Sequence, residues 1–527
     1  MKKTLLLILA ILIILCTSGC TENATTSTAT PTVTAPAQKT TSVKEEPTPE
    51  FTPEPTPEPT AAPITVNTGR KLSEYTLSVS LNTDSHTLTV DQKLNYVNNT
   101  DTALDDIYFN LIPEAFRADG GGVNMQSVSV DGENSAIEQV KETVYRLPLP
   151  SELAAGNTAE ISMLYTVMIP NIRNRFGYQE SAYNLGNFIA TPAVYGDNGW
   201  TVEPYVDVGD AFYTETARYT VTITVPEGYD VAATGEETAP GTYRAEDVRD
   251  FAFCASDSWT VEEAEQDGIG IKLYYDGDAE KTAECVINTA QRSLALFSEK
   301  FGPYPYDTLN IVMNRLTGGV NGMEYPMLVM ISPGVTLDDM EGMGFDLDDK
   351  YSIASCISTT EQSVCHEIAH QWFYGVVGND QVTEPWLDEG MCRFAEYLYQ
   401  TEYPPETDDP DILKSLLVES QLESWHEWVL AAEAGDTDKY APDTTYLDKD
   451  LYYWQADDPI PYSEIYYKGA ALVYEIQQQM GEDAFESALK EYVRRFAYGI
   501  VTTESFREFW NEKTDTTRIF ELYFREN

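Results

Sequence analysis

Apolar and polar residues alternate along the segment 70–260 with the two-residue period of β-strands. Between Glu74 and Asn99, two such runs flank the polar residues 82–85, which predicts a pair of strands joined by a turn. Residues 217–226 (ARYTVTITVP) predict another strand. We therefore expect residues 70–260 to form an N-terminal antiparallel β domain.

From about residue 260 onward the apolar period lengthens to that of helices, with short strands in between. Residues 283–302 predict a helix, and residues 309–314 (LNIVMN) predict a strand. Further helices are expected around the sequences HEIAH and WLDEG, after Tyr466, and twice more near the C-terminus. Residues 261–527 are thus a mostly helical second domain, and the fold class is α+β with several domains.

The first 20 residues have the pattern of an export signal. Lys2 and Lys3 supply positive charge, and the apolar run Leu5–Cys16 that follows them is too short to span a bilayer. The sequence Thr-Ser-Gly-Cys then resembles a lipobox, which predicts a lipid on Cys20. We expect a lipoprotein on the outer face of the cytoplasmic membrane; cleavage nearby and secretion is the alternative.

Residues 21–69 are rich in Thr, Pro, Ala and Glu, and they include the near-repeat PTPEFTPEPTPEPT. Such a composition buries little apolar surface and favours an extended, disordered chain. We expect this segment to be a linker that holds the folded domains away from the membrane.

The chain is strongly acidic: 86 Asp and Glu oppose 33 Lys and Arg, which gives a net charge of −53. This charge argues against binding to nucleic acid or to anionic lipid by electrostatic attraction. Solubility at a cell surface is the simplest explanation; adaptation to high salt and a preference for cationic substrates are the alternatives.

The sequence HEIAH, residues 366–370, carries the strongest chemical signal. On a helix, His366 and His370 project from one face, one turn apart, and Glu367 lies between them. A hydrolytic zinc site needs three protein ligands and one open position, and Glu389, nineteen positions after His370, is a suitable third ligand. The pattern also occurs by chance, but two of only four histidines in the chain lie in it.

Five cysteines remain after Cys20: Cys254, Cys285, Cys356, Cys365 and Cys392. Because five is odd, at least one of them has no partner within the chain. Cys365 adjoins His366, but on a helix its direction differs by about 100°, so we expect it to be a packing residue rather than a ligand.

Four motifs in this order resemble the M1 aminopeptidases, which are zinc peptidases with the pattern HExxH, eighteen residues, then Glu. Upstream, residues 321–326 (NGMEYP) resemble the family's GxMEN exopeptidase motif, with Met323 and Glu324 retained. Downstream, Tyr466 begins a Tyr-x-Lys-Gly element. Residues 301–312 (FGPYPYDTLNIV) resemble the segment before the exopeptidase motif.

The resemblance implies a β-sandwich-like domain over 70–260 and a thermolysin-like zinc catalytic domain over 261–527. The chain is too short to hold the large C-terminal helical domain of many members, so we expect an open active site. Residues 191–205 resemble a loop that approaches the site.

The resemblance also implies a role for each site residue. His366, His370 and Glu389 would bind one Zn²⁺, and Glu367 would act as general base on a water molecule. The hydroxyl of Tyr466 would donate to the developing oxyanion, with Tyr467 as the alternative donor.

Glu324 would bind the free α-ammonium of a peptide and, together with Met323, would form the substrate-binding group. Asn321 and Gly322 replace the family's Gly and Ala, and Tyr325 replaces its Asn, so the resemblance does not define the shape of the first specificity pocket. Glu396, seven residues after Glu389, is expected to hold a metal-binding histidine through a hydrogen bond.

Two segments, 334–351 and 403–462, are longer than the family usually allows, and both could rim the cleft. The first contains an acidic cluster at 346–349 whose spacing matches no EF-hand loop, so a solvated loop is preferred to a calcium site.

Three functions remain open. The first is a zinc aminopeptidase at the cell surface, acting on peptides with a free N-terminus. The second is a zinc endopeptidase or another hydrolase on the same scaffold. The third is a non-catalytic binding protein, against which the intact set of ligands and catalytic residues argues. The oligomeric state is unknown.

Overall fold

The computed structural model describes residues 70–525, apart from residues 197, 278, 315, 317–320, 333, 348–349, 408, 434–445 and 457–463. The predicted signal peptide, Cys20 with its predicted lipid, and the predicted linker 21–69 lie outside the described residues. No helix in the described part of the chain is both long enough and apolar enough to cross a membrane.

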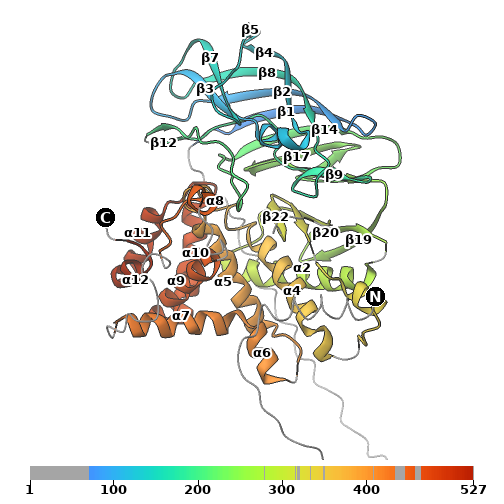
Figure 1. Ribbon diagram of the computed structural model, residues 1–527. Helices are drawn as coiled ribbons and strands as arrows, with labels where there is room; N and C mark the ends of the chain where they lie inside the picture. The colour runs from blue at the N-terminus through green and yellow to red at the C-terminus, as the bar shows by residue number, and fades with distance from the viewer. Residues whose placement is uncertain are drawn as a thin grey trace, which may run out of the picture. The chain divides into compact units, whose positions relative to one another are not determined.

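The N-terminal region is built around an eight-stranded sheet (Figure 1). In spatial order the sheet contains β16 (Glu236–Ala239), β17 (Thr242–Val248), β14 (Ala217–Thr224), β1 (Ser73–Asn82), β2 (Thr87–Val97), β8 (Thr158–Met168), β4 (Gly122–Val130) and β5 (Glu133–Ser135). Along β2, buried and exposed residues alternate as the sequence predicts. The turn before β2 is fixed by Asn82, whose Oδ1 accepts hydrogen bonds from the backbone N–H groups of Asp84 and Ser85, both at 3.0 Å.

One pairing in this sheet differs from the antiparallel prediction. β1 lies parallel to β14, with Ser73 opposite Ala217, whereas the other pairs are antiparallel. A parallel pair needs a long connection, and here more than a hundred residues separate the two strands in sequence. The alternation within each strand gave no information about this partner.

Two four-stranded sheets share a core with the large sheet. The first contains β11 (Thr191–Pro192), β3 (Leu104–Asn110), β7 (Val144–Leu153) and β6 (Glu138–Gln139), and the second contains β15 (Asp230–Ala233), β18 (Phe253–Ser256), β10 (Ala182–Leu185) and β9 (Phe176–Gln179). The short strands β12 (Tyr195–Gly196) and β13 (Gly199–Trp200) form a hairpin.

The second region begins with a five-stranded sheet in the order β19 (Trp259–Gln266), β20 (Ile269–Asp276), β21 (Thr308–Met313), β23 (Leu328–Ile331) and β22 (Gly322–Tyr325). The boundary expected near residue 260 therefore falls at the start of β19. β22, which carries the sequence GMEY, is an edge strand of this sheet.

Apart from a short 3₁₀ helix at Ile112–Asp119 in the β domain, the other elements of the described residues are the helices α2 (Glu280–Phe301), α3 (Leu337–Gly342), α4 (Lys350–Ala369), α5 (Trp386–Glu402), α6 (Pro410–Leu416), α7 (Val418–Glu433), α8 (Leu451–Ala456), α9 (Glu464–Met480), α10 (Glu482–Phe496), α11 (Thr503–Lys513) and α12 (Thr517–Tyr523). The predicted α+β organisation, with a β domain before a mostly helical region, is confirmed.

Helices α5 and α9 touch at two glycines. A Cβ on Gly390 would lie 2.6 Å from the Cα of Gly469, so any larger side chain would force the helices apart. Gly469 is the glycine of the Tyr-x-Lys-Gly element, and this contact is the physical reason for a glycine there. The close approach holds the first turn of α5 beside the first turn of α9.

The two long segments contribute helices. α3 lies in 334–351 and is capped by Thr336, which exchanges hydrogen bonds with Asp339. The segment 403–462 contains α6, α7 and α8, and at its α8 end the N–H of Leu451 donates to Val382 O at 2.9 Å. The hydroxyl of Tyr452 donates to Pro204 O at 2.6 Å, so α8 also contacts the β domain. The predicted acidic cluster lies partly outside the described residues.

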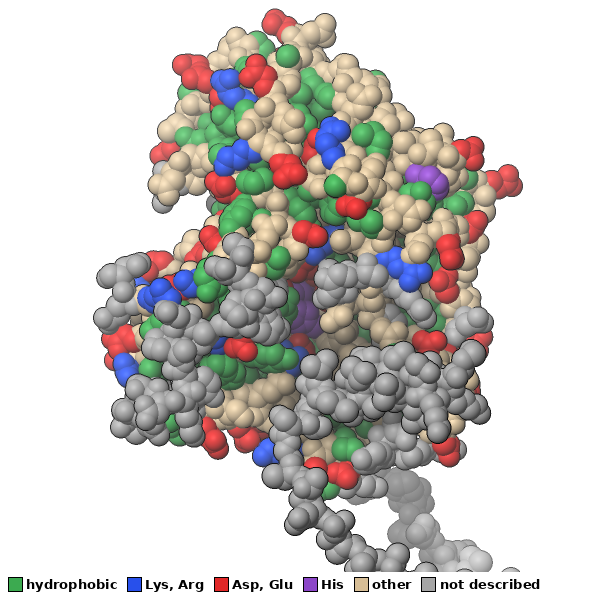
Figure 2. All heavy atoms as spheres, in the orientation of Figure 1, with side chains coloured by type: hydrophobic (Ala, Val, Ile, Leu, Met, Phe, Trp, Pro, Cys, Tyr) green, Lys and Arg blue, Asp and Glu red, His purple; other side chains and the backbone are tan. Residues whose placement is uncertain are grey.

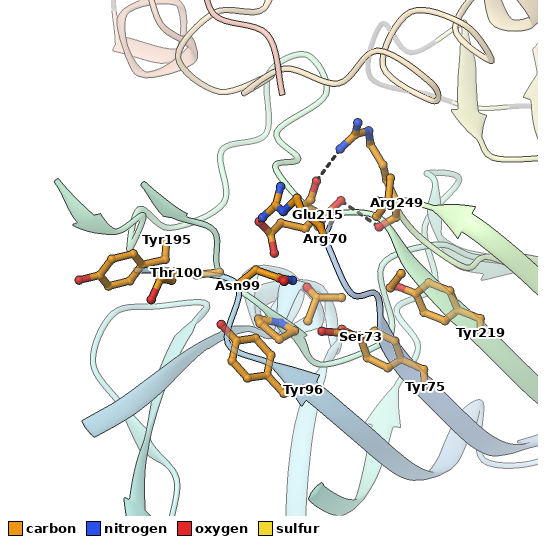
Figure 3. A pocket seen from close by; sticks show the side chains of 16 residues that line it. Arg70, Ser73, Tyr75, Tyr96, Asn99, Thr100, Tyr195, Glu215, Tyr219 and Arg249 are labelled. Carbon is orange, nitrogen blue, oxygen red and sulfur yellow. Dashed lines mark hydrogen bonds and ion pairs between the residues drawn. The ribbon is translucent and has the colours of Figure 1, made fainter. Parts of the chain in front are cut away.

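Arg249 joins the two regions. It is buried, its Nε donates to Tyr374 O at 2.6 Å, and its Nη1 and Nη2 donate to Thr214 O at 3.0 Å and Gly499 O at 2.5 Å. Figure 3 shows Arg249 at one side of a small pocket of about 60 Å³ in the β domain. A Cβ on Gly378 would lie 2.1 Å from Cζ of Arg249, so the guanidinium occupies the space a larger residue would need.

Replacing Gly378 by Ala should destabilise the protein by about 1–3 kcal/mol through overpacking against Arg249. In an Arg249→Met background the added methyl group has more room, so the same change should cost clearly less. A double-mutant cycle of urea unfolding measures the difference. Equal costs in both backgrounds would contradict this packing. Gly342→Ala is the matched control, since its Cβ would meet nothing within 4 Å.

Candidate metal centre

The C-terminal end of α4 brings two imidazoles to one point. The backbone N–H of His370 donates to His366 O at 3.2 Å, which keeps the two residues one helical turn apart. Their Nε2 atoms lie 3.1 Å from each other. Glu389, in the first turn of α5, places its Oε2 3.2 Å from Nε2 of His366 and 3.5 Å from Nε2 of His370. The structure thus brings the three predicted ligands together.

Each imidazole is oriented through its other nitrogen. Nδ1 of His366 donates to Oε1 of Glu396 at 2.9 Å, and Nδ1 of His370 donates to Phe373 O at 3.1 Å. With Nδ1 held by these acceptors, each Nε2 faces the shared point, and loss of its proton would free a lone pair for a metal ion. Arg393 in turn donates to the other oxygen of Glu396. Glu396 therefore lies where the sequence placed it, against a histidine.

The charges around this point favour a bound cation. Burial alone would raise the pKa of Glu389, but hydrogen bonds and charges from His366 and His370 lower it to about 2. Burial would lower the pKa of His366, but its hydrogen bonds to Glu389 and Glu396 raise the value to about 10. Two imidazole nitrogens and one ionised carboxylate oxygen are a donor set that fits Zn²⁺ with an open position.

Glu367 is the next residue of α4 after His366. It is 7% exposed, and a Cβ on Gly322 would lie 2.1 Å from its Oε1, so its carboxylate rests directly against the edge strand β22. Burial raises the pKa of Glu367 to about 7, although His366 and His370 act in the opposite direction.

Glu324, two residues after Gly322 on β22, faces the same side of the strand. One carboxylate oxygen each of Glu324 and Glu367 and one nitrogen of His370 lie within 4.8 Å of one another. Burial, and then the charge of Asp210, raises the pKa of Glu324 well above its usual value. The predicted ammonium-binding residue is therefore next to the predicted base.

Tyr466 reaches the centre from the first turn of α9. Its hydroxyl donates to Oε1 of Glu389 at 2.5 Å, and its ring stacks on His366 with 5.7 Å between ring centroids. Tyr467, the alternative donor, instead packs its ring against the guanidinium of Arg393, 4.7 Å from the ring centroid.

Met323 is the remaining predicted residue. It points to the other face of β22 from Glu324, is 1% exposed, and lies in the core of the β domain with its Sδ 3.6 Å from Nη1 of Arg175. Its assignment as a substrate-binding residue stays a prediction. Cys365, expected to be a packing residue, is buried with its Sγ 3.4 Å from Gln362 O.

Three further residues near the centre were missed from the sequence. Asp210, on a loop of the β domain, forms an ion pair with the buried Arg175 and acts on the pKa values of both Glu324 and Glu367. Gln381, between α4 and α5, donates to Glu324. Asp210 is one of 86 acidic residues and follows the loop expected at 191–205, so no spacing rule could have selected it.

Figure 2 shows histidine side chains at the bottom of a hollow in this face of the molecule, below the β domain. His366 is the most accessible of the three predicted ligands, with 12% of its side chain exposed, whereas His370 and Glu389 are 2% exposed. A small molecule or an extended chain can thus approach the centre from this side.

Comparison with known proteins places these residues in a family. Residues 285–523 match the family model described as Peptidase family M1 domain. The chain is 26% identical over 250 residues to Aminopeptidase M1-A of Oryza sativa subsp. japonica, covering 46% of this chain and 25% of the relative. It is 23% identical over 250 residues to human Endoplasmic reticulum aminopeptidase 1, covering 47% of this chain and 24% of the relative. The chain therefore spans about a quarter of the length of these curated relatives.

Among solved structures, the M1 zinc metallopeptidase from Deinococcus radiodurans has the same fold, with a TM-score of 0.58 at 17% identity over 86% of this chain and 94% of that chain. A mutant of that metallopeptidase bound to a Tyr-Ser-Ala substrate matches with a TM-score of 0.56 at 17% identity, again over 86% of this chain and 94% of that chain. The family match covers α4, α5, α9 and His370, and so includes the three predicted ligands, the predicted base and the predicted catalytic tyrosine. Residues 285–523 therefore form a domain of peptidase family M1.

Proposed function

We propose that the protein is a zinc-dependent aminopeptidase that removes residues one at a time from the N-terminus of peptides. The observation that carries this proposal is the position of Glu324, a buried carboxylate on an edge strand, beside both Glu367 and His370. The relatives named above are aminopeptidases, which agrees with this proposal.

His366, His370 and Glu389 would hold the zinc ion. Bound Zn²⁺ supplies Lewis-acid chemistry, because it lowers the pKa of water and polarises the scissile carbonyl. Glu396 and the carbonyl of Phe373 keep the two histidines in the tautomer that binds metal.

Glu367 would act as the general base. A carboxylate with a pKa near 7 can take a proton from the attacking water and still release it. As the water oxygen bonds to the carbonyl carbon and the C–N bond breaks, the proton passes from Glu367 to the leaving amine. The contact with Gly322 keeps the carboxylate on the side of the cleft formed by β22.

The hydroxyl of Tyr466 is a donor at the edge of the same centre. It donates to Glu389 in this structure, and rotation toward the scissile carbonyl would let it donate to the developing oxyanion. The Gly390–Gly469 contact between α5 and α9 fixes its distance from the ligands.

Glu324 would restrict cleavage to the N-terminus. A buried carboxylate without a cation is unfavourable, and among the described residues no Lys or Arg forms a salt bridge with Glu324. The α-ammonium of a peptide would supply that charge through a charge-assisted hydrogen bond. Cleavage would then occur at the peptide bond that follows the first residue.

Incubating the zinc-loaded protein with one peptide, free or N-acetylated, tests this function. Mass spectrometry should show a ladder of single-residue losses from the free peptide alone. Glu367→Gln is the control and should lower the rate by about 10²–10⁴-fold. Internal cuts in both peptides would indicate an endopeptidase instead, and no cleavage of either would favour a binding role.

Gly322→Ala should lower kcat by about 10²-fold, because the new Cβ would occupy the position of Oε1 of Glu367 and displace the base. Zinc content, measured by atomic absorption, should not change, since Gly322 is not a ligand. Gly270→Ala, on the same sheet, is the control: its Cβ would meet only Asp307 O, at 3.8 Å. Loss of zinc in Gly322→Ala, or unchanged kcat, would show that this contact does not position the base.

We also propose that the enzyme works at the cell surface, held by a lipid on Cys20 through the linker 21–69; the supporting observation is the signal-like sequence before that cysteine. Cells fed a labelled fatty acid should label the wild-type protein and not Cys20→Ser, which should appear in the medium. Unlabelled wild-type protein in the medium would mean secretion without an anchor.

A further inference from the structure

Gln381 links the two halves of the candidate site. It lies between α4 and α5 and is 1% exposed. Its Nε2 donates to Oε1 of Glu324 at 2.8 Å and to Oδ2 of Asp388 at 2.6 Å. Its backbone N–H donates to Phe212 O, on the β-domain loop that carries Asp210, at 3.3 Å. One side-chain amide thus uses both of its N–H donors on two buried carboxylates.

These two contacts fix the direction of the amide. Each carboxylate is an acceptor, so both require the NH₂ group, and turning the amide over would set its oxygen against two carboxylates. Oε1 of Gln381 therefore faces away from both of them. It is buried, and no hydrogen-bond donor among the described residues reaches it. A buried acceptor left in this state is unfavourable unless something that binds there donates to it.

The substrate proposed above would bring such a donor. An α-ammonium has three N–H groups, and Glu324 satisfies at most two of them through its carboxylate. We propose that Gln381 is a second contact for the α-ammonium: Oε1 accepts one of its N–H groups while Nε2 holds Glu324 in place. This inference rests on the proposed aminopeptidase function. It adds Gln381 to Glu324 as a second residue that selects substrates with a free α-amine.

A purely structural role for Gln381 would look different. Asn379, two residues earlier, is 2% exposed, and its Nδ2 donates to Oδ1 of Asp388 at 2.9 Å and to Glu384 O at 3.2 Å. Asn379 thus ties the same loop to the same aspartate, and it does so without contacting Glu324. Loss of either amide should disturb the loop, but only Gln381 should affect recognition of the amine.

The test compares two zinc-loaded variants, Gln381→Met and Asn379→Leu, with the wild type. Each is given a peptide and its des-amino analogue, which lacks only the α-amino group. For Gln381→Met, kcat/KM should fall about 10- to 100-fold on the peptide and change little on the analogue, the loss expected for one hydrogen bond to a charged group. For Asn379→Leu, the ratio of the two kcat/KM values should stay that of the wild type.

The outcomes separate this inference from the proposed function. If the wild type cleaves peptide and analogue equally well, the aminopeptidase proposal itself fails. If the wild type discriminates and Gln381→Met discriminates as strongly, only the inference is overturned. An equal loss on both substrates in both variants means that Gln381 acts through loop structure, which also overturns it.

A crystal structure removes any dependence on how Gln381→Met folds. The Glu367→Gln protein soaked with the same peptide should show the α-nitrogen within hydrogen-bond distance of both Glu324 and Oε1 of Gln381. An α-nitrogen bound to Glu324 and to Asp210 instead, with Oε1 bonded to water, would overturn the inference.

Discussion

Negative charge buried at one place is the constraint on which this structure depends. Five acidic side chains near the centre are each at most 7% exposed: Glu324, Glu367, Asp388, Glu389 and Glu396. Burying so many carboxylates is unfavourable unless positive charge and hydrogen-bond donors accompany them. Arg393 forms an ion pair with Glu396, and the imidazoles lie against Glu389. Side-chain amides donate hydrogen bonds to Asp388. The two places left for cations are those where a metal ion and a peptide's α-ammonium would bind, so binding and the stability of the site are coupled.

The geometry of that charge cluster is set by residues with no charge at all. Gly390 and Gly469 bring α5 against α9 so that Tyr466 reaches Glu389, and Gly322 leaves room for Glu367 beside β22. Gly378 leaves room for Arg249, whose Nε fixes the carbonyl of Tyr374, one residue after the carbonyl that orients His370. At each of these four positions glycine is required because a side chain would not fit. Backbone conformation is not the reason, since none of the four has a positive φ.

What the sequence could predict is what lies within one element or one short motif. The spacing of His366 and His370 follows from the helical period, and Glu396 follows from its place two turns after Glu389. Strand alternation located β1, β2 and β14, but it said nothing of the parallel pairing of β1 with β14. Arg175 with Asp210, and Gln381 with Glu324, join residues far apart in sequence without any repeating pattern. Such contacts arise only when the two regions pack together. A single sequence contains no periodicity or motif from which they could be predicted.

The net charge of −53 suggests that the enzyme prefers substrates with cationic residues at the cleavage site. The structure argues against surface charge as the source of such a preference. At physiological ionic strength, exposed charges are screened beyond about 8 Å, so surface carboxylates act weakly on a side chain within the hollow. A preference for cationic substrate residues would have to come from acidic side chains inside the hollow. Of these, Asp210 is paired with Arg175, Glu389 would be a ligand of the metal ion, and Glu324 would bind the α-ammonium. None of these three carboxylates would then be available to bind a cationic side chain of the substrate. The acidic surface is better explained by solubility than by substrate specificity.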